Sequence, residues 1–194
     1  GYMRVFPNIV LMAPGDAHDV APMLDFALAQ NSPTSMRYPK TNADQIERDV
    51  APMELGRAEV IQWGEDGTIL CCGTLLAEGI AAAQLLKEEC GLDVAVVNAR
   101  FVKPLDREIL SRAINETGFV VTVEEAALMT GFGSAVLEAA NEMRLDTRRI
   151  RRLGVPDEFV HHGDRSDLLA ELGLDARGIF NACRDMVEQV AQLT

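Results

Sequence analysis

From residue 57 onward, short apolar segments alternate with segments that carry apolar residues at helical spacing. Residues 119–123 (Phe-Val-Val-Thr-Val) are continuously apolar or β-branched, which indicates a strand covered on both faces of its sheet. Parallel strands need a crossover connection, usually a helix, to reach one another. The alternation therefore predicts an α/β fold with a mostly parallel sheet flanked by helices.

Turn residues and helical spacing give the bounds of the individual elements. We expect strands at residues 58–63, 68–72, 94–98, 119–123 and 150–153, and helices at residues 75–90, 104–116, 134–145, 165–172 and 176–192. The first two strands are expected to pair with each other through the turn at residues 64–67, which begins and ends with glycine.

The chain opens with a strand at residues 8–12, a helix that Asp16 can cap and that runs to about residue 30, and a strand at residues 34–38. Two strands and one helix cannot bury a core unaided. We expect this β-α-β piece to be a docking arm or the end of a domain whose beginning lies outside the sequence. The predicted division is residues 1–39, a linker at residues 40–56, and a second domain at residues 57–194.

The formal net charge of −12 at pH 7 argues against nucleic-acid and anionic-membrane partners, because both surfaces repel a negative protein. The sequence contains no run of 18 apolar residues and no secretory signal pattern in residues 1–15, so we expect a cytoplasmic protein. The four cysteines, Cys71, Cys72, Cys90 and Cys183, form no Cys-x-x-Cys pair and are expected to be buried free thiols.

Two adjacent carboxylates, Glu124 and Glu125, could form an acid/base pair. Neighbouring residues of a strand face opposite sides, so structural or interface carboxylates are the favoured interpretation. The segment Gly-Phe-Gly-Ser at residues 131–134 could be an anion-binding nest, but it is favoured as the start of a helix with a close backbone contact.

His161 and His162 lack a third ligand at metal spacing, and we expect them to be loop histidines rather than a metal site. The arginines at positions 148, 149, 151 and 152 are expected to pair with nearby carboxylates or to line an interface. No Ser/His/Asp or Cys/His constellation supports an independent catalytic site, so we predict no catalytic residue in this chain.

Several segments in order carry a family resemblance. They are Arg-Phe-Val-Lys-Pro-Leu-Asp at residues 100–106, Val-Thr-Val-Glu-Glu at 121–125, Leu-Gly-Val-Pro-Asp-Glu-Phe at 153–159 and Glu-Leu-Gly-Leu-Asp-Ala at 171–176. Together they resemble the C-terminal domain of the transketolase family, and residues 100–106 and 171–176 are similar to its 1-deoxy-D-xylulose-5-phosphate synthase branch. Residues 6–14 and 35–39 resemble the last strand, helix and strand of the pyrimidine-binding domain of that branch.

The resemblance implies an enzyme that uses thiamine diphosphate and Mg²⁺ to condense pyruvate with glyceraldehyde 3-phosphate and release carbon dioxide. In this family the cofactor and metal sites, and the glutamate that activates thiamine, lie in earlier parts of the chain. The resemblance therefore implies no cofactor or metal site here, an isolated chain that is inactive, a homodimer as the intact enzyme, and the rest of that enzyme as partner.

The resemblance assigns one functional site of the family, the phosphate-binding site of the substrate, to residues of this chain. The family motif Arg-Tyr-Pro-Arg places its second arginine at the phosphate of glyceraldehyde 3-phosphate, and this sequence has Arg37-Tyr38-Pro39-Lys40. The resemblance implies that Lys40 contacts the phosphate as a point charge rather than a bidentate fork. Arg37 is the second candidate for phosphate binding, but a structural ion pair inside the strand is the favoured interpretation of this residue.

Two other functions stay open. The first is a free-standing α/β interaction module that docks through residues 1–38 and has no enzymatic activity. The second is the tail of a 2-oxo-acid dehydrogenase β subunit, which the Arg-Phe-Val-Lys sequence at residues 100–103 disfavours.

Overall fold

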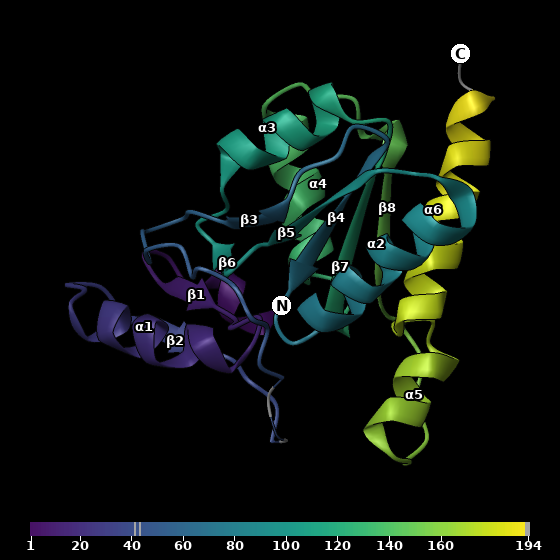
Figure 1. Cartoon of the computed structure of the whole chain (residues 1–194). Helices are drawn as coiled ribbons and strands as arrows, with labels where there is room; N and C mark the ends of the chain where they lie inside the picture. Colours follow the sequence, from purple (N-terminus) through teal and green to yellow (C-terminus); the bar gives the residue numbers. More distant parts are fainter. Residues whose placement is uncertain (41, 43, 193–194) are drawn as a thin grey trace.

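Two sheets organise the chain in a computed structural model that describes residues 1–40, 42 and 44–192 (Figure 1). The larger sheet has five strands in the order β3 (Glu59–Gln62), β5 (Val94–Asn98), β4 (Gly67–Cys72), β7 (Val120–Ala127) and β8 (Ile150–Val155). Its pairings are parallel except between β3 and β5. The predicted α/β class with a mostly parallel sheet is confirmed.

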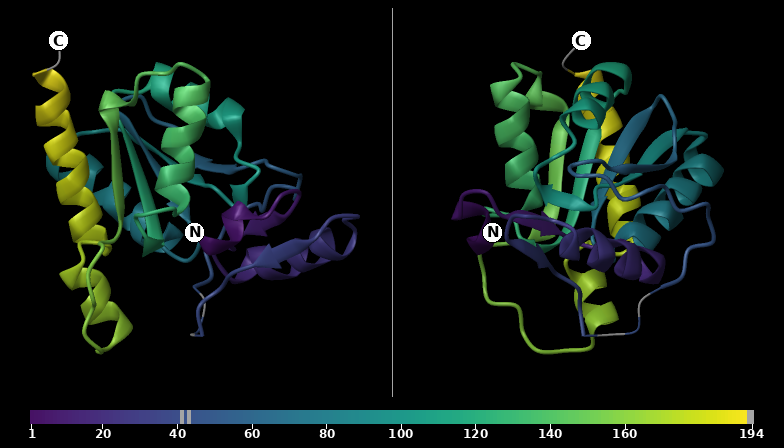
Figure 2. Two further views of the ribbon diagram at one scale, coloured as in Figure 1. Left: turned by 180° about the vertical axis from the view of Figure 1, so that it is seen from behind. Right: turned by 90° about the vertical axis from the view of Figure 1, so that its left-hand side faces the viewer.

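Helices cover both faces of the larger sheet (Figures 1 and 2). α2 (Leu76–Cys90) and α6 (Ala176–Ala191) pack on one face, where their side chains form a core with Ile69 and Val121. α3 (Arg107–Glu116) and α4 (Phe132–Glu142) cover the other face. Because neighbouring strand residues point to opposite faces, Ile69 and Leu70 lie in different cores.

The predicted pairing of the first two strands of this domain is wrong. β3 pairs antiparallel with β5, and β5 lies between β3 and β4. All six residues of β4 are buried, and both of its edges hold parallel partners, β5 and β7. A hairpin with β3 would have occupied the edge of β4 that β5 uses.

The third helix of the prediction also begins later than expected. α3 starts at Arg107, because the side chain of Asp106 caps it by accepting hydrogen bonds from the N–H groups of Glu108 and Ile109. The C-terminal end of the chain contains α5 (Arg165–Glu171) before α6, and short 3-10 helices lie at Tyr2–Val5 (η1) and Thr147–Arg149 (η2).

The smaller sheet has the order β2 (Thr34–Met36), β1 (Val10–Met12) and β6 (Phe101–Lys103). β1 and β2 are parallel and are joined by α1 (Ala17–Leu28), whose cap Asp16 accepts from the N–H of Asp19, as predicted. β6 comes from the connection after β5 and pairs antiparallel with β1. The small core of this N-terminal unit, residues 1–38, is completed by Phe101.

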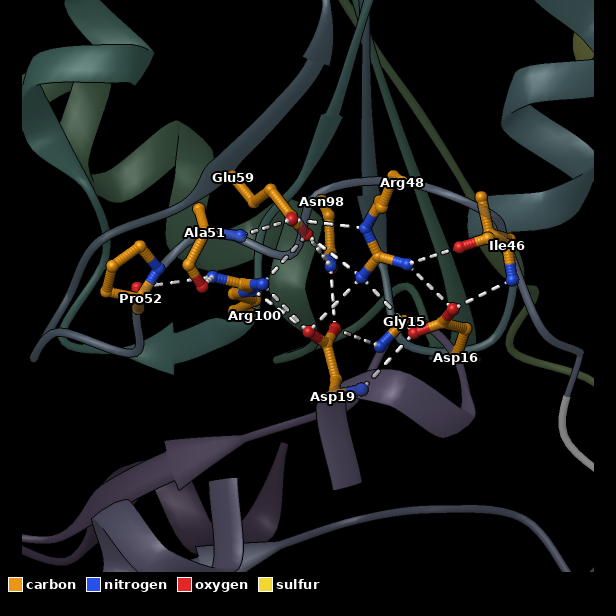
Figure 3. Close-up of polar contacts among 10 residues, drawn as sticks. All are labelled: Gly15, Asp16, Asp19, Ile46, Arg48, Ala51, Pro52, Glu59, Asn98 and Arg100. Atoms are coloured by element: carbon orange, nitrogen blue, oxygen red, sulfur yellow. Dashed lines mark hydrogen bonds and ion pairs between the residues drawn. The ribbon is translucent and has the colours of Figure 1, made fainter. Parts of the chain in front are cut away.

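A buried ionic cluster joins the N-terminal unit to the larger sheet (Figure 3). Two arginines, Arg48 and Arg100, hold three carboxylates, those of Asp16, Asp19 and Glu59. The Nη2 of Arg100 lies 2.9 Å from Asp19 Oδ1 and 2.9 Å from Glu59 Oε2. The Nη1 of Arg48 lies 2.7 Å from Asp16 Oδ2. All five side chains are at least nine-tenths buried, so the cluster fixes the two sheets relative to each other.

Amide and backbone groups complete the cluster. The side-chain Nδ2 of Asn98, the last residue of β5, donates to Asp19 at 2.7 Å and to Glu59 at 3.1 Å. The N–H of Gly15 donates to Asp19. Arg100 adopts a left-handed backbone conformation with a φ of 54°, which is costly for a residue with a side chain. The ion pairs of its guanidinium give a reason for that conformation.

The segment predicted as a linker supplies one of the two arginines. The side chain of Arg48 is only 9% exposed. Burial alone would raise the pKa of Asp16 and Glu59, but hydrogen bonds from Arg48 and from backbone N–H groups hold both pKa values below their ordinary ones. The predicted division into domains at residues 39 and 57 stays a prediction.

Replacing Arg100 with Met should leave Asp19 and Glu59 buried with one arginine between them. We expect the free energy of unfolding in a denaturant titration to fall by about 3–5 kcal/mol. The matched control is Arg107→Met, which removes an exposed ion pair with Glu142 and should change stability by less than about 1 kcal/mol. Equal losses in the two variants would show that the cluster does not hold the sheets together.

The lowered pKa values of Asp16 and Glu59 predict a loss of stability in acid. Their contribution is present above the ordinary values of 3.8 and 4.5 and is lost as the pH falls through the lower values of the folded state. In Arg48→Met, which removes the main cause of the lowering, the free energy of unfolding should depend less steeply on pH between about pH 5 and about pH 3. Parallel pH profiles of the variant and the wild type would contradict this.

Candidate functional site

The candidate site lies at the carboxyl ends of β4 and β7. The chain leaves β4 for β5 on one side and later returns to β7 on the other, which makes this edge a topological switch point. In open α/β sheets, ligands bind in the crevice outside the strand ends at such a point. The N-terminal unit lies at this end of the sheet in both views of Figure 2.

A cavity of about 320 Å³ remains between the two sheets. Its walls include Ala13 and Arg37 from the N-terminal unit, and Cys72 and Glu124 from the larger sheet. Burial raises the pKa of the Cys72 thiol to about 12, and the nearby Glu124 adds to the effect. Cys72 is therefore a neutral thiol at neutral pH and not a nucleophile.

Glu124 binds the beginning of α4. Its carboxylate accepts from the N–H of Phe132 at 2.6 Å and from the N–H of Gly133 at 2.7 Å. Burial raises the pKa of Glu124, and these two hydrogen bonds oppose the rise only in part. A Cβ at Gly131 would meet Glu124 Oε2 and the carbonyl oxygen of Ala127. The Gly-Phe-Gly-Ser segment is thus the start of a helix, and the anion at its N–H groups is a side chain of the same protein.

Glu125 faces different partners, so the two adjacent carboxylates do not form an acid/base pair. The Nε and Nη2 of Arg165, the first residue of α5, donate to Glu125 at 3.0 and 2.8 Å. The same Nη2 donates to the Oγ1 of Thr74 at 3.1 Å. On the other side, Arg37 Nη1 lies 4.0 Å from Glu125 Oε2. The two glutamates thus have separate partners within this chain, and their role as structural or interface carboxylates stays a prediction.

A second cavity of about 440 Å³ lies next to Glu125 and under α5. Lys40, Glu125 and Arg165 form its polar wall. Pro39 and mainly aliphatic residues of β8, the loop before α5, α5 and the following turn form the rest. Arg37 lines the first cavity, Lys40 lines the second, and Glu125 lines both. The structure thus places the two predicted phosphate-binding residues around one carboxylate.

The sequence pattern for the transketolase C-terminal domain matches residues 56–179. The chain belongs to the transketolase C-terminal domain family. Over 190 residues it is 50% identical to the 1-deoxy-D-xylulose-5-phosphate synthase of Rhodopirellula baltica, covering 98% of this chain and 30% of that protein. Over 180 residues it is 44% identical to the synthase of Symbiobacterium thermophilum, covering 92% of this chain and 28% of that protein. The chain thus spans about 30% of the length of its curated relatives.

Solved structures agree with this membership. A split gene transketolase, solved as an inactive β4 tetramer, superposes with a TM-score of 0.88 at 31% identity, over 96% of this chain and 60% of that one. The transketolase of Campylobacter jejuni superposes with a TM-score of 0.72 at 17% identity, over 95% of this chain and 27% of that one, and shows the fold alone.

The cofactor of the transketolase family does not fit the residues described here. A thiamine site needs carboxylates that are free to bind Mg²⁺ or the thiamine ring. The buried carboxylates of Asp16, Asp19 and Glu59 are held by arginines, and that of Glu124 by backbone N–H groups. Among the described residues no group of three or more His, Cys, Asp or Glu side chains could hold a metal ion. Within the same residues, no helix has the length and apolarity that a membrane span requires.

Other predicted residues are not among those that line the two cavities. His161 and His162 are exposed in the loop before α5. Arg148 pairs with Asp146, whereas Arg152 donates to the carbonyl oxygen of Leu128 and to Ser134. Cys90 is the last residue of α2 and is exposed, so the prediction of buried cysteines is wrong for this residue.

Arg165 and Thr74 were missed by the sequence analysis. Arg165 was only the first residue of the helix predicted at residues 165–172, and Thr74 lies immediately before the helix predicted at residues 75–90. Thr74 lies immediately before α2, and Arg165 lies 91 residues after Thr74 in the chain. No local sequence pattern can therefore connect the two residues. Only the order of the strands brings α5 to the carboxyl ends of β4 and β7.

Replacing Gly131 with Ala should disturb the contact between Glu124 and α4. The new Cβ would overlap the carboxylate and a backbone oxygen, and overpacking of this kind costs about 1–3 kcal/mol. The free energy of unfolding should fall by that amount in a denaturant titration. The control is Gly91→Ala, where a Cβ meets nothing within 4 Å but the φ of 70° is unfavourable for alanine. A smaller loss in Gly131→Ala than in Gly91→Ala would contradict the close contact.

Proposed function

We propose that this chain works as the carboxyl-terminal part of a thiamine-diphosphate-dependent 1-deoxy-D-xylulose-5-phosphate synthase. The whole enzyme condenses pyruvate with glyceraldehyde 3-phosphate and releases carbon dioxide. The observation that carries the proposal is the 50% identity to the Rhodopirellula baltica synthase over 98% of this chain. The bound cofactor supplies the carbon–carbon chemistry of the intact enzyme, and this chain supplies positioning.

The positioning role rests on residues that hold Lys40 and Arg37 in place. The ionic cluster fixes the N-terminal unit, and β2 of that unit leads directly to Arg37 and Lys40. Arg37 lines the cavity at the switch point, where a small phosphorylated substrate is expected, and Lys40 lines the neighbouring cavity on the other side of Glu125. Lys40 and Arg37 would bind the phosphate of glyceraldehyde 3-phosphate there.

By itself the chain is proposed to be inactive. Its buried carboxylates are already engaged, and the similar split gene transketolase was solved as an inactive tetramer of its β chains. Its proposed partners are the rest of the enzyme and a second copy in a homodimer, in the cytoplasm. A non-enzymatic interaction module predicts instead a gene that encodes this chain alone, and the upstream reading frame distinguishes the two.

Isothermal calorimetry on the 194-residue chain tests the inactive role directly. With Mg²⁺ present, thiamine diphosphate should give no binding heat. The full-length synthase, measured in the same buffer, is the positive control. Magnesium-dependent binding to the chain alone would contradict the proposal.

In the full-length enzyme, Lys40→Ala should raise the KM for glyceraldehyde 3-phosphate by about tenfold while kcat changes little, because a charge-assisted phosphate contact made in the ground state is lost. Lys40→Arg should retain most of the affinity. The control is Lys87→Ala, which removes an exposed lysine that pairs with Asp93 on α2's side of the sheet. An unchanged KM in Lys40→Ala would remove Lys40 from the phosphate site.

A further inference from the structure

The loop between β8 and α5 has few contacts with the rest of the chain. Residues 157–164 are all exposed, and in the right-hand view of Figure 2 the loop runs as a wide arc below the larger sheet. No hydrogen bond or ion pair joins residues 156–163 to another residue that the structure describes. The loop is therefore held mainly at its two ends, by β8 and by α5.

Phe159 lies in the middle of this loop. Its exposed fraction is 102%, which means that no neighbour covers the aromatic ring. A second aromatic residue, Tyr38, lies on the segment that follows β2 and is 62% exposed. A single exposed apolar side chain is ordinary on a protein surface, so the meaning of these two depends on what lies beside them.

The cavity under α5 lies next to both aromatic residues. Val160 and Gly163 of the loop line this cavity of about 440 Å³, and so does Pro39, the residue after Tyr38. The other aliphatic residues of its wall are Val155, Leu168, Leu169, Leu172 and Leu174. Exposed aromatic side chains beside an apolar pocket are typical of the centre of a protein-binding surface.

The size of this surface restricts what can cover it. An aromatic side chain buries about 150–250 Å², so Phe159 and Tyr38 together offer about 300–500 Å². A stable complex of two separate proteins buries about 800 Å² on each partner. Two copies of this chain would also repel each other, since each has a net charge of −12. The surface therefore suits a segment that is tethered nearby and avoids most of the entropy cost of association.

The proposed function supplies such a tethered segment. The Rhodopirellula baltica synthase matches 98% of this chain, but the match covers only 30% of that protein. Most of a synthase therefore lies outside these 194 residues, and its segments are held close to this chain within one enzyme.

We propose that Phe159 and Tyr38 anchor this chain to an apolar segment of the rest of the synthase, and that this segment lies against the aliphatic wall of the cavity under α5. The contact uses the aliphatic residues and leaves Lys40 to its proposed phosphate. The inference rests on the proposed function in one point, that this chain is part of a longer synthase.

Photo-crosslinking in the full-length enzyme identifies what Phe159 contacts. A photoreactive p-benzoylphenylalanine is incorporated at position 159, and mass spectrometry identifies the crosslinked peptide. The peptide should come from outside these 194 residues. A crosslink only to a peptide within them, which indicates the chain's own cavity or a second copy, would overturn the inference, and so would the absence of any crosslink.

Hydrogen exchange tests the same contact through variants of the full-length enzyme. The backbone amides of residues 157–163 should exchange about tenfold or more slowly than in the 194-residue chain, because docking restricts the loop. Phe159→Ser should remove this protection, and Phe159→Leu should keep most of it because the apolar bulk remains. The control is Glu158→Ser, which removes a neighbouring exposed side chain that is not apolar and should leave the protection unchanged.

Three exchange results contradict the docking of Phe159. One is equal exchange of the loop in the full-length enzyme and in the chain alone. Another is protection that survives Phe159→Ser or is lost equally in Glu158→Ser. The third is protection in the chain alone that disappears in Phe159→Ser, since the occupant would then belong to this chain or to its second copy.

Neither measurement needs turnover, so the two proposals can fail separately. A full-length protein without synthase activity whose position 159 crosslinks outside these 194 residues supports the docking and removes only the proposed activity. An active synthase whose position 159 crosslinks only within them overturns the docking and leaves the proposed activity in place.

Discussion

The carboxylate of Asp19 is fully buried, and Arg100, Arg48, Asn98 and the N–H of Gly15 all contact it. Charges without a partner are too costly in a protein interior, so the segments that carry these groups must meet in one arrangement. They come from the start of α1, the irregular segment before β3, and the end of β5. The position of the smaller sheet on the larger one depends on this meeting.

That position determines the chemistry of the crevice at the carboxyl ends of β4 and β7. The N-terminal unit closes the crevice and leaves two cavities that share Glu125 as a wall. The two glutamates at the end of β7 have separate tasks. Glu124 satisfies the first N–H groups of α4, whereas Glu125 is bound by Arg165 at 2.8 Å and lies 4.0 Å from Arg37.

In the proposed synthase the bound cofactor supplies the carbon–carbon chemistry and this chain supplies geometry. The buried carboxylates hold the architecture, and Arg37 and Lys40 line the two cavities that share Glu125. This arrangement fits a part of a transketolase-like synthase that presents cations to a phosphorylated substrate.

The sequence by itself determined the order and type of nearly all elements. Apolar β-branched runs such as residues 119–123 and caps such as Asp16 are local signals, so they can be recognised without the tertiary structure. It also determined the family, because the ordered motifs at residues 100–106 and 171–176 do not depend on the fold. Tertiary structure alone decided that β5 lies between β3 and β4, that Arg48 in a polar segment is buried, and that Arg165 reaches Glu125. These outcomes depend on the order of the strands and on the pairing of charges that are distant in the chain. Neither produces a periodic pattern in the sequence from which it could be predicted.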